Sequence, residues 1–333
     1  MMKKIDGHLH LVRTIAGLNG KGRLNALGGG KAIWDDGTVI QLIPQGSGED
    51  SFTAEAALQL MDGADVEKAV LLQGSLNGYQ NYYSYQMVKK YPERFIAAFS
   101  VDPFADNAMT IVKRQVEESG FRAIKFEISQ GGGLHGYHSE KPFRLDTDAK
   151  VGEIFHYLAD YPGFTVTVDY GSSDQVSYQP EAIANLAARY PLMDFVVCHL
   201  SFPSVGHLNR LKAALELFKP FSNIYTDLSA IQDIVGERDF PYPNCQKVLT
   251  VAKEILGTKR LIWGTDSPWS ATFNSYDDLA SWLAASGRLT DEELADVLYN
   301  NAERVYFKKS AVQAAAEADD PVLLFDEAQR EDK

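Results

Sequence analysis

Cysteine is scarce in this sequence and long hydrophobic runs are absent, and both facts exclude classes of protein. The 333 residues include only Cys198 and Cys245, without the close pairing of a zinc-binding motif. We therefore expect no disulfide framework and a reducing compartment. No apolar stretch reaches the roughly 18 residues of a membrane-spanning helix, and the first residues lack the apolar core of a signal peptide. These features predict a cytoplasmic protein that does not enter a membrane.

Positive charge is also in deficit. The chain has 32 Lys and Arg residues against 45 Asp and Glu residues, a formal net charge of −13. Nucleic acids and anionic membranes are bound through clustered Lys and Arg, so the composition argues against both partners. One local cation would still suffice to bind a small acidic molecule. Hydrophobic residues make up 45% of the chain, enough for a large core.

Short β-branched or aromatic segments alternate with longer amphipathic ones along the chain. The strand candidates are residues 3–8, 68–74, 94–101, 122–128, 164–170, 194–200, 223–229 and 260–266. Eight strand–helix units in about 250 residues predict a (β/α)8 TIM barrel of the α/β class. A doubly wound open sheet is the main alternative. Such a sheet usually has a Gly-rich phosphate-binding turn after its first strand, whereas this chain has DGHLHL.

The remaining length has two places in a single-domain barrel covering residues 1–310. The Gly-rich residues 13–52 are predicted to form a long loop or hairpin after the first strand. Residues 311–333, acidic and rich in Ala, are predicted to form a helical C-terminal extension. Either segment could pack on a second copy of the chain, and a homodimer is the commonest oligomer.

Ionisable residues occur where the predicted strands end, which is where barrels of this kind have their active sites. His8 and His10 are two residues apart on an extended strand, so their side chains point to the same side. Later strands end in the following ionisable residues: Lys125, Glu127, Asp169, His199, Asp227 and Asp266. Imidazole and carboxylate groups are ligands of divalent metals, so this pattern predicts a metal site at one rim.

Each of these residues also has a structural alternative. Asp266 could form a turn before Pro268, and Asp227 could cap the following helix. Lys125 could simply pair with Glu127 inside the barrel. The metal hypothesis therefore rests on the set of residues in register and not on any single one.

Seven motifs make the sequence similar to a known family. In chain order they are IDGHLH, YPERFIAAFSVDP, GFRAIKFE, LAARYPLMDFVVCHLSFP, IYTDLSA, LIWGTDSPW and NNAERVYF. The sequence resembles the amidohydrolase superfamily, in particular the amidohydrolase-related branch that includes aminocarboxymuconate semialdehyde decarboxylase. In that branch a first-strand HxH, a fifth-strand His and an eighth-strand Asp hold one metal, usually zinc, beside a sixth-strand His.

The resemblance implies roles for four residues of this chain. His8 and His10 would be metal ligands, Asp266 a ligand or proton acceptor, and His199 the acid/base residue. The fifth strand departs from the family pattern, because Asp169 stands where a His is usual.

A carboxylate binds zinc at about the same distance as imidazole, so Asp169 could complete the metal shell. Glu127, His135 or His138 could do so instead. A shell with more carboxylates is harder, and manganese or iron could then replace zinc.

These residues predict a metal-dependent hydrolase acting on an amide, ester or lactone of a small organic acid. The alternatives are a non-oxidative decarboxylase or hydratase of an unsaturated or aromatic carboxylic acid, a metal-free lactonase, and a non-catalytic binding barrel. A carboxylate substrate would need a cation, and aromatic side chains would suit a planar or aromatic substrate. The candidates for these contacts are Arg13, Lys125, Tyr170 and Trp269.

Overall fold

The computed structural model describes residues 2–130, 133–134 and 142–307. The predicted extension at 311–333 and the candidate ligands His135 and His138 lie outside the described residues. Among the described helices, none combines the length and the apolar character needed to cross a membrane.

Eight parallel strands in the described chain form two sheets. One sheet contains β1 (Ile5–Leu9), β6 (Lys68–Leu71) and β7 (Phe95–Ala97). The other contains β8 (Ala123–Glu127), β9 (Thr165–Asp169), β10 (Asp194–Val197), β11 (Ile224–Asp227) and β12 (Leu261–Ile262). Each strand overlaps one of the eight predicted from the sequence. Every residue of β1, β8 and β9 is buried, as expected for parallel strands covered on both faces.

Isolated parallel bridges lie where the two sheets meet. Phe99 pairs with Ile124 at one junction, and Leu9 pairs with Ser267 at the other. Isolated bridges therefore link the parallel sheets of three and five strands at both junctions.

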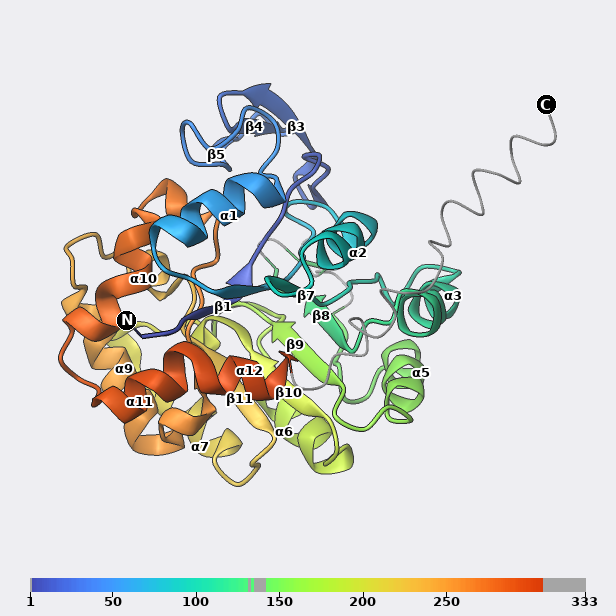
Figure 1. The fold of residues 1–333 in the computed structure, drawn as a ribbon. Coiled ribbons are helices and arrows are strands. Elements are labelled where there is room, and N and C mark those ends of the chain that lie inside the picture. The colour runs from blue at the N-terminus through green and yellow to red at the C-terminus, as the bar shows by residue number, and fades with distance from the viewer. Residues whose placement is uncertain (1, 131–132, 135–141, 308–333) are drawn as a thin grey trace.

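Helices surround these strands (Figure 1). They are α1 (Ala54–Gly63), α2 (Asn81–Lys90), α3 (Ala108–Lys113), α5 (Ala149–Leu158), α6 (Pro180–Arg189), α7 (Leu208–Phe218), α8 (Ile231–Ile234), α9 (Pro243–Leu256), α10 (Tyr276–Ala285), α11 (Asp291–Ala295) and α12 (Asn301–Val305). Several begin at polar N-cap residues. The Asp148 carboxylate accepts the first free N–H groups of α5, and Thr290 forms a capping box with Glu293 at α11.

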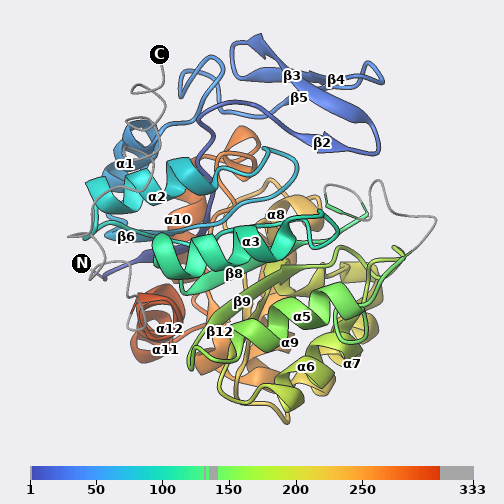
Figure 2. The ribbon, with the colours of Figure 1, turned by 90° about the vertical axis from the view of Figure 1, so that its right-hand side faces the viewer.

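The segment after β1 is more regular than the predicted loop or hairpin. It forms a four-stranded antiparallel sheet of β2 (Leu18–Asn19), β3 (Gly22–Gly28), β4 (Lys31–Trp34) and β5 (Val39–Gln41). The Leu18 N–H donates to the Ser75 carbonyl, and the Ala16 N–H donates to the Asn77 carbonyl. This sheet lies toward the end of the molecule opposite α11 and α12 (Figure 2).

The NNAERVYF motif closes the end of the molecule where the strands begin. The Asn301 side-chain amide donates to the carbonyls of Thr258 and Leu261, and the Thr165 hydroxyl donates to the Val305 carbonyl. The motif therefore has a structural role. The polar residues predicted for the site lie at the other ends of the strands.

Candidate active site

A cavity of about 430 Å³ lies at the carboxyl ends of the strands. Buried ionisable side chains line its inner part, and we call them the inner group: His10, Lys125, Glu127, Asp169, His199 and Asp266. Larger and less buried side chains line its other part, and we call them the outer wall: Phe202, Ile234, Arg238, Trp269 and Phe273. The sequence predicted every member of the inner group.

Three predicted residues lie close enough to share one metal ion. The Asp266 Oδ1 is 2.9 Å from the His10 Nε2 and 3.4 Å from the His8 Nε2. These three atoms form one of the candidate ligand groups among the described residues. Metal–ligand bonds of about 2.1 Å would place neighbouring ligand atoms roughly 3.0–3.4 Å apart in octahedral or tetrahedral geometry, so the separations fit a shared cation.

Hydrogen-bond acceptors face the Nδ1 atoms of both histidines. The His8 Nδ1 lies 3.0 Å from the Asp227 Oδ2, and the His10 Nδ1 lies 2.9 Å from the Leu72 carbonyl oxygen. Both partners accept hydrogen bonds, so each Nδ1 carries the proton and each Nε2 presents a lone pair. This is the arrangement in which backbone or carboxylate partners orient metal-binding histidines.

A lone pair on the His10 Nε2 cannot face a carboxylate at 2.9 Å without a cation or proton between them. Burial and the Lys125 ammonium lower the pKa of His8 to about 4, and burial lowers the pKa of His10. Both rings are therefore neutral near pH 7. The donor set fits a divalent cation better than a shared proton.

The path of the chain at β12 brings Asp266 to β1. The Asp266 N–H donates to the His8 carbonyl, and the His10 N–H donates to the Ser267 carbonyl. Gly264 lies between these contacts, where an added Cβ would be 2.8 Å from the His8 Cβ. The Asp6 carboxylate accepts hydrogen bonds from the N–H groups of His8 and Thr265. The glycine and the carboxylate together hold the HxH and GTD segments side by side.

His199 lies outside the strand on which it was predicted. The strand expected over residues 194–200 ends at Val197. From His199 the backbone turns left-handed for four residues, His199 to Phe202, with φ between 48° and 60°. Such a conformation costs about 1–2 kcal/mol per residue with a side chain, and strain of this kind is concentrated at functional sites. The Asp227 Oδ1 accepts the His199 N–H at 2.9 Å and fixes the turn.

Acceptors face both nitrogens of the His199 ring. The Nδ1 lies 3.1 Å from the Ser229 carbonyl oxygen, and the Nε2 lies 3.5 Å from the Asp169 Oδ2. Although burial opposes it, the Asp169 carboxylate raises the pKa of His199 to about 10. In return, against the effect of burial, the hydrogen bond with His199 lowers the pKa of Asp169 to about 2. His199 is therefore charged at neutral pH and suited to donate a proton.

Lys125 and Glu127 pair with each other, as the structural alternative predicted. The Lys125 Nζ is 3.3 Å from the Glu127 Oε2, and also 3.3 Å from the His8 Nε2. Burial and the nearby Asp169 carboxylate raise the pKa of Glu127 to about 8. Neither Asp169 nor Glu127 belongs to a candidate ligand group in the described part of the chain. Their proposed place in the metal shell stays a prediction.

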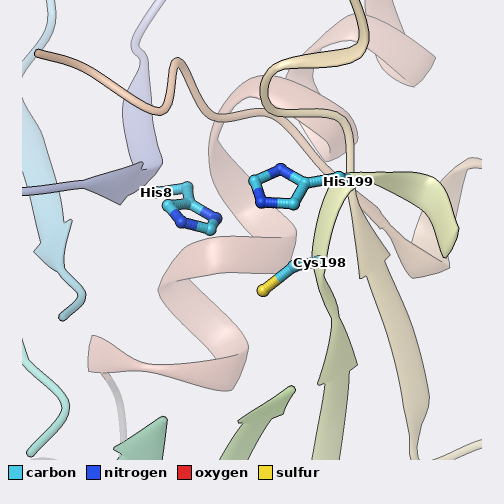
Figure 3. A group of neighbouring side chains, drawn as sticks. All are labelled: His8, Cys198 and His199. Atoms are coloured by element: carbon cyan, nitrogen blue, oxygen red, sulfur yellow. The ribbon is translucent and has the colours of Figure 1, made fainter. Parts of the chain in front are cut away.

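Figure 3 shows a second candidate ligand group, formed by His8, Cys198 and His199. The two rings are stacked with centroids 4.8 Å apart. Burial raises the pKa of the Cys198 thiol well above its usual value, whereas a metal needs the thiolate. The Ser229 hydroxyl also lies 3.1 Å from the His8 Nδ1 and 2.9 Å from the His199 Nδ1. The group with Asp266 is the better metal site.

The predicted substrate contacts divide into two pairs. Lys125 and Trp269 line the cavity, whereas Arg13 and Tyr170 are not among its lining residues. Arg13 is exposed, and the Tyr170 hydroxyl is buried 2.6 Å from the Ser201 Oγ. The sequence suggested one contact directly after HLH and one directly after Asp169, but neither residue lines the cavity.

Two residues have more important positions than the sequence indicated. Asp227 was predicted mainly as a helix cap, yet its carboxylate contacts the His8 ring and the His199 backbone. The position of Asp227 at a strand end was the feature of the sequence that indicated a place in the site. Arg238 follows α8 and lines the outer wall. It has no strand-end position or motif that could have identified it.

Comparison with known proteins identifies the family of the chain. The model of the amidohydrolase family matches residues 5–308. The chain belongs to the amidohydrolase family. This confirms the resemblance seen in the seven motifs.

Two curated relatives match part of the chain. Protein fluG of Emericella nidulans is 29% identical over 38% of this chain and 15% of its own length. The L-fucono-1,5-lactonase of Burkholderia ambifaria is 28% identical over 31% of this chain and 36% of its own length. The matched segments thus span well under half of either relative.

Solved structures of other proteins share the fold. An amidohydrolase from Burkholderia multivorans with bound zinc has a TM-score of 0.66 and 18% identity, over 91% of this chain and 98% of that one. The 2,6-dihydroxybenzoate decarboxylase from Rhizobium has a TM-score of 0.55 and 15% identity, over 76% of this chain and 87% of that one. A zinc-containing amidohydrolase and a decarboxylase therefore share this fold.

Proposed function

We propose that this amidohydrolase is a metal-dependent hydrolase, built on a closed (β/α)8 barrel, that cleaves an amide, ester or lactone of a small organic acid. One observation carries the proposal: the Nε2 lone pairs of His8 and His10 converge on one Asp266 oxygen, while both Nδ1 atoms are held by acceptors. Zinc is the first candidate for the metal, with manganese or iron as alternatives.

The chain's own residues divide the work of hydrolysis. His8, His10 and the Asp266 Oδ1 would hold the cation, which supplies Lewis-acid polarisation and makes water more acidic. The described residues give the Asp266 Oδ2 no hydrogen bond, so this oxygen is free to accept a proton from the attacking water. The charged His199 ring donates a proton to the leaving group, and Asp169 keeps the ring protonated.

Lys125 supports a second candidate function. Its ammonium lies 3.3 Å from the His8 Nε2, where it could hold a substrate carboxylate next to the cation. That position suits non-oxidative decarboxylation, and a decarboxylase is among the proteins with this fold. The net charge of −13 supports a small molecule over a nucleic acid as the substrate in either case.

The test uses protein stripped of metal and then reloaded with zinc, manganese or iron. We expect hydrolysis of at least one ester, lactone or amide in a substrate panel to need the metal and to disappear in Asp266→Asn. Release of carbon dioxide from a carboxylic acid, with no hydrolysis, would favour the second candidate. Full activity of the stripped protein would contradict both.

A further inference from the structure

The cavity changes character from its inner group to its outer wall. Apolar side chains dominate the wall, and the Trp269 and Phe273 rings meet edge to face with centroids 5.3 Å apart. Arg238 is its charged member, and Asp233 also lines the cavity. A molecule in this cavity therefore meets both the inner group and an apolar wall that contains one guanidinium.

The surrounding chain fixes Arg238 in place. Its guanidinium carbon lies 4.8 Å from the centroid of the Phe273 ring, a cation–π contact. Its Nη1 donates to the Glu237 carbonyl at 2.9 Å and lies 3.1 Å from the Asp233 Oδ1. The Glu237 carboxylate in turn accepts the backbone N–H groups of Asn244 and Cys245 at the start of α9. The guanidinium is thus held at one nitrogen and stacked on one face.

Within the described chain, the Nε–Nη2 edge of the Arg238 guanidinium has no hydrogen-bond partner. The hydrogen bonds of Arg238 within the described chain all use Nη1, which leaves Nε and Nη2 as a pair of parallel donors. Such a pair matches the two oxygens of a carboxylate. Asp233 does not use this edge, and it also accepts hydrogen bonds from Ser270 and Asn274.

We infer that the Nε–Nη2 edge of Arg238 binds a substrate carboxylate that takes no part in the reaction. The substrate is then a small acid with an apolar or planar body, which lies along Trp269 and Phe273 between Arg238 and the bond to be cleaved. The assignment of the reacting end rests on the proposed function, whereas the binding of a carboxylate by Arg238 does not. A carboxylate held at the outer wall would make the substrate an acid whose other group reacts, as in hydrolysis.

Binding of benzoate and of its neutral analogue benzamide tests this inference without catalysis. Titration calorimetry on the metal-free full-length protein removes any contribution from a bound cation. We expect benzoate to bind about 10–100-fold more tightly than benzamide, as a charge-assisted pair of hydrogen bonds allows. Arg238→Gln should remove that preference and leave benzamide binding unchanged. Arg238→Lys should keep only part of the preference for benzoate, because lysine retains the charge but lacks the pair of parallel N–H donors.

Arg114→Gln is the matched control, because Arg114 is a half-exposed residue that pairs with Glu118 on a helical surface. It should behave as the wild type. If Arg238→Gln weakened the binding of benzoate and of benzamide equally, Arg238 would only stabilise the segment after α8. That result would overturn the inference. A benzoate preference that survives in Arg238→Gln would overturn it as well, by placing the carboxylate elsewhere.

Hydrolysis of 4-acetoxybenzoate and of its methyl ester by the metal-loaded protein separates this inference from the proposed function. Hydrolysis of neither ester, with the benzoate preference intact, would count against the proposed function alone. Hydrolysis of both at equal rates, in the wild type and in Arg238→Gln, would support the proposed function and contradict the role of Arg238.

Discussion

The ligand group and the outer wall of one cavity are built in different ways. His8, His10 and Asp266 are buried and lie on or after the parallel strands β1 and β12. The His8 ring contacts Asp227 of β11, and the His10 ring contacts the Leu72 carbonyl after β6. Arg238 and Phe273 follow α8 and β12, and about 43% of each side chain is exposed. Under the two proposals made above, the strands fix the chemistry and the connecting segments select the substrate.

The largest effect should come from Asp266→Asn, which keeps the shape of the side chain but removes its charge. We expect kcat to fall by roughly 10²–10⁴-fold, because the proton acceptor is lost. Asp277→Asn, an exposed change on α10, is the control and should leave kcat unchanged. Steady-state kinetics on metal-loaded protein measures both variants. If Asp266→Asn kept most of the wild-type kcat, Asp266 would not be the proton acceptor.

Gly264→Ala should damage the ligand group without changing a ligand. The added Cβ would lie 2.8 Å from the His8 Cβ and from the His8 backbone nitrogen, so β1 must move. We expect a loss of about 1–3 kcal/mol in the free energy of unfolding, together with reduced metal content.

Gly152→Ala on α5 is the matched control, because its added Cβ meets nothing within 4 Å. It should be neutral or stabilising by up to about 1 kcal/mol. Urea unfolding and metal analysis of both variants make the comparison. Wild-type stability and metal content in Gly264→Ala would show that the close approach of β1 and β12 is not needed.

Asp227→Asn tests how far the partners of the histidines matter. The amide can still face the His8 Nδ1, but it lacks the charge that orients and polarises the ring. We expect metal affinity to fall by about 10–100-fold, measured by competition with a chelator. An unchanged affinity would mean that Asp227 serves only the turn at His199.

The smallest effect should come from the outer wall. Phe273→Ala removes the ring that contacts the Arg238 guanidinium, and with it part of the outer wall. We expect KM for an acidic substrate to rise by less than about tenfold with kcat nearly constant, since a cation–π contact at a partly exposed site is weak. A fall in kcat as large as that of Asp266→Asn would remove the distinction between the two regions.

The same distinction explains what could be predicted from the sequence. All eight parallel strands were predicted, because strands covered on both faces are continuous apolar runs. The predicted metal and acid/base residues lie on those strands or within four residues of their ends. Their contacts with Asp227 could not be predicted, because they join chain positions up to 219 residues apart.

The rest of the structure depends on contacts without a periodic signal. The left-handed turn at His199 is fixed by Asp227 from the next strand, so the run of apolar residues through Leu200 suggested a longer strand. The antiparallel sheet after β1 has short, Gly-rich strands that pair with distant backbone at Ser75. The position of Arg238 depends on Phe273 and on the start of α9.

The metal content of protein purified without added metal tests the central claim most directly. The wild type should be measured beside His8→Ala/His10→Ala and beside His156→Ala/His207→Ala, which changes two exposed histidines outside the cavity. We predict about one equivalent of zinc, manganese or iron in the wild type and the control, and less than about a tenth of that in the His8/His10 variant. Equal metal content in all three proteins, or none in the wild type even after reconstitution, would contradict the account.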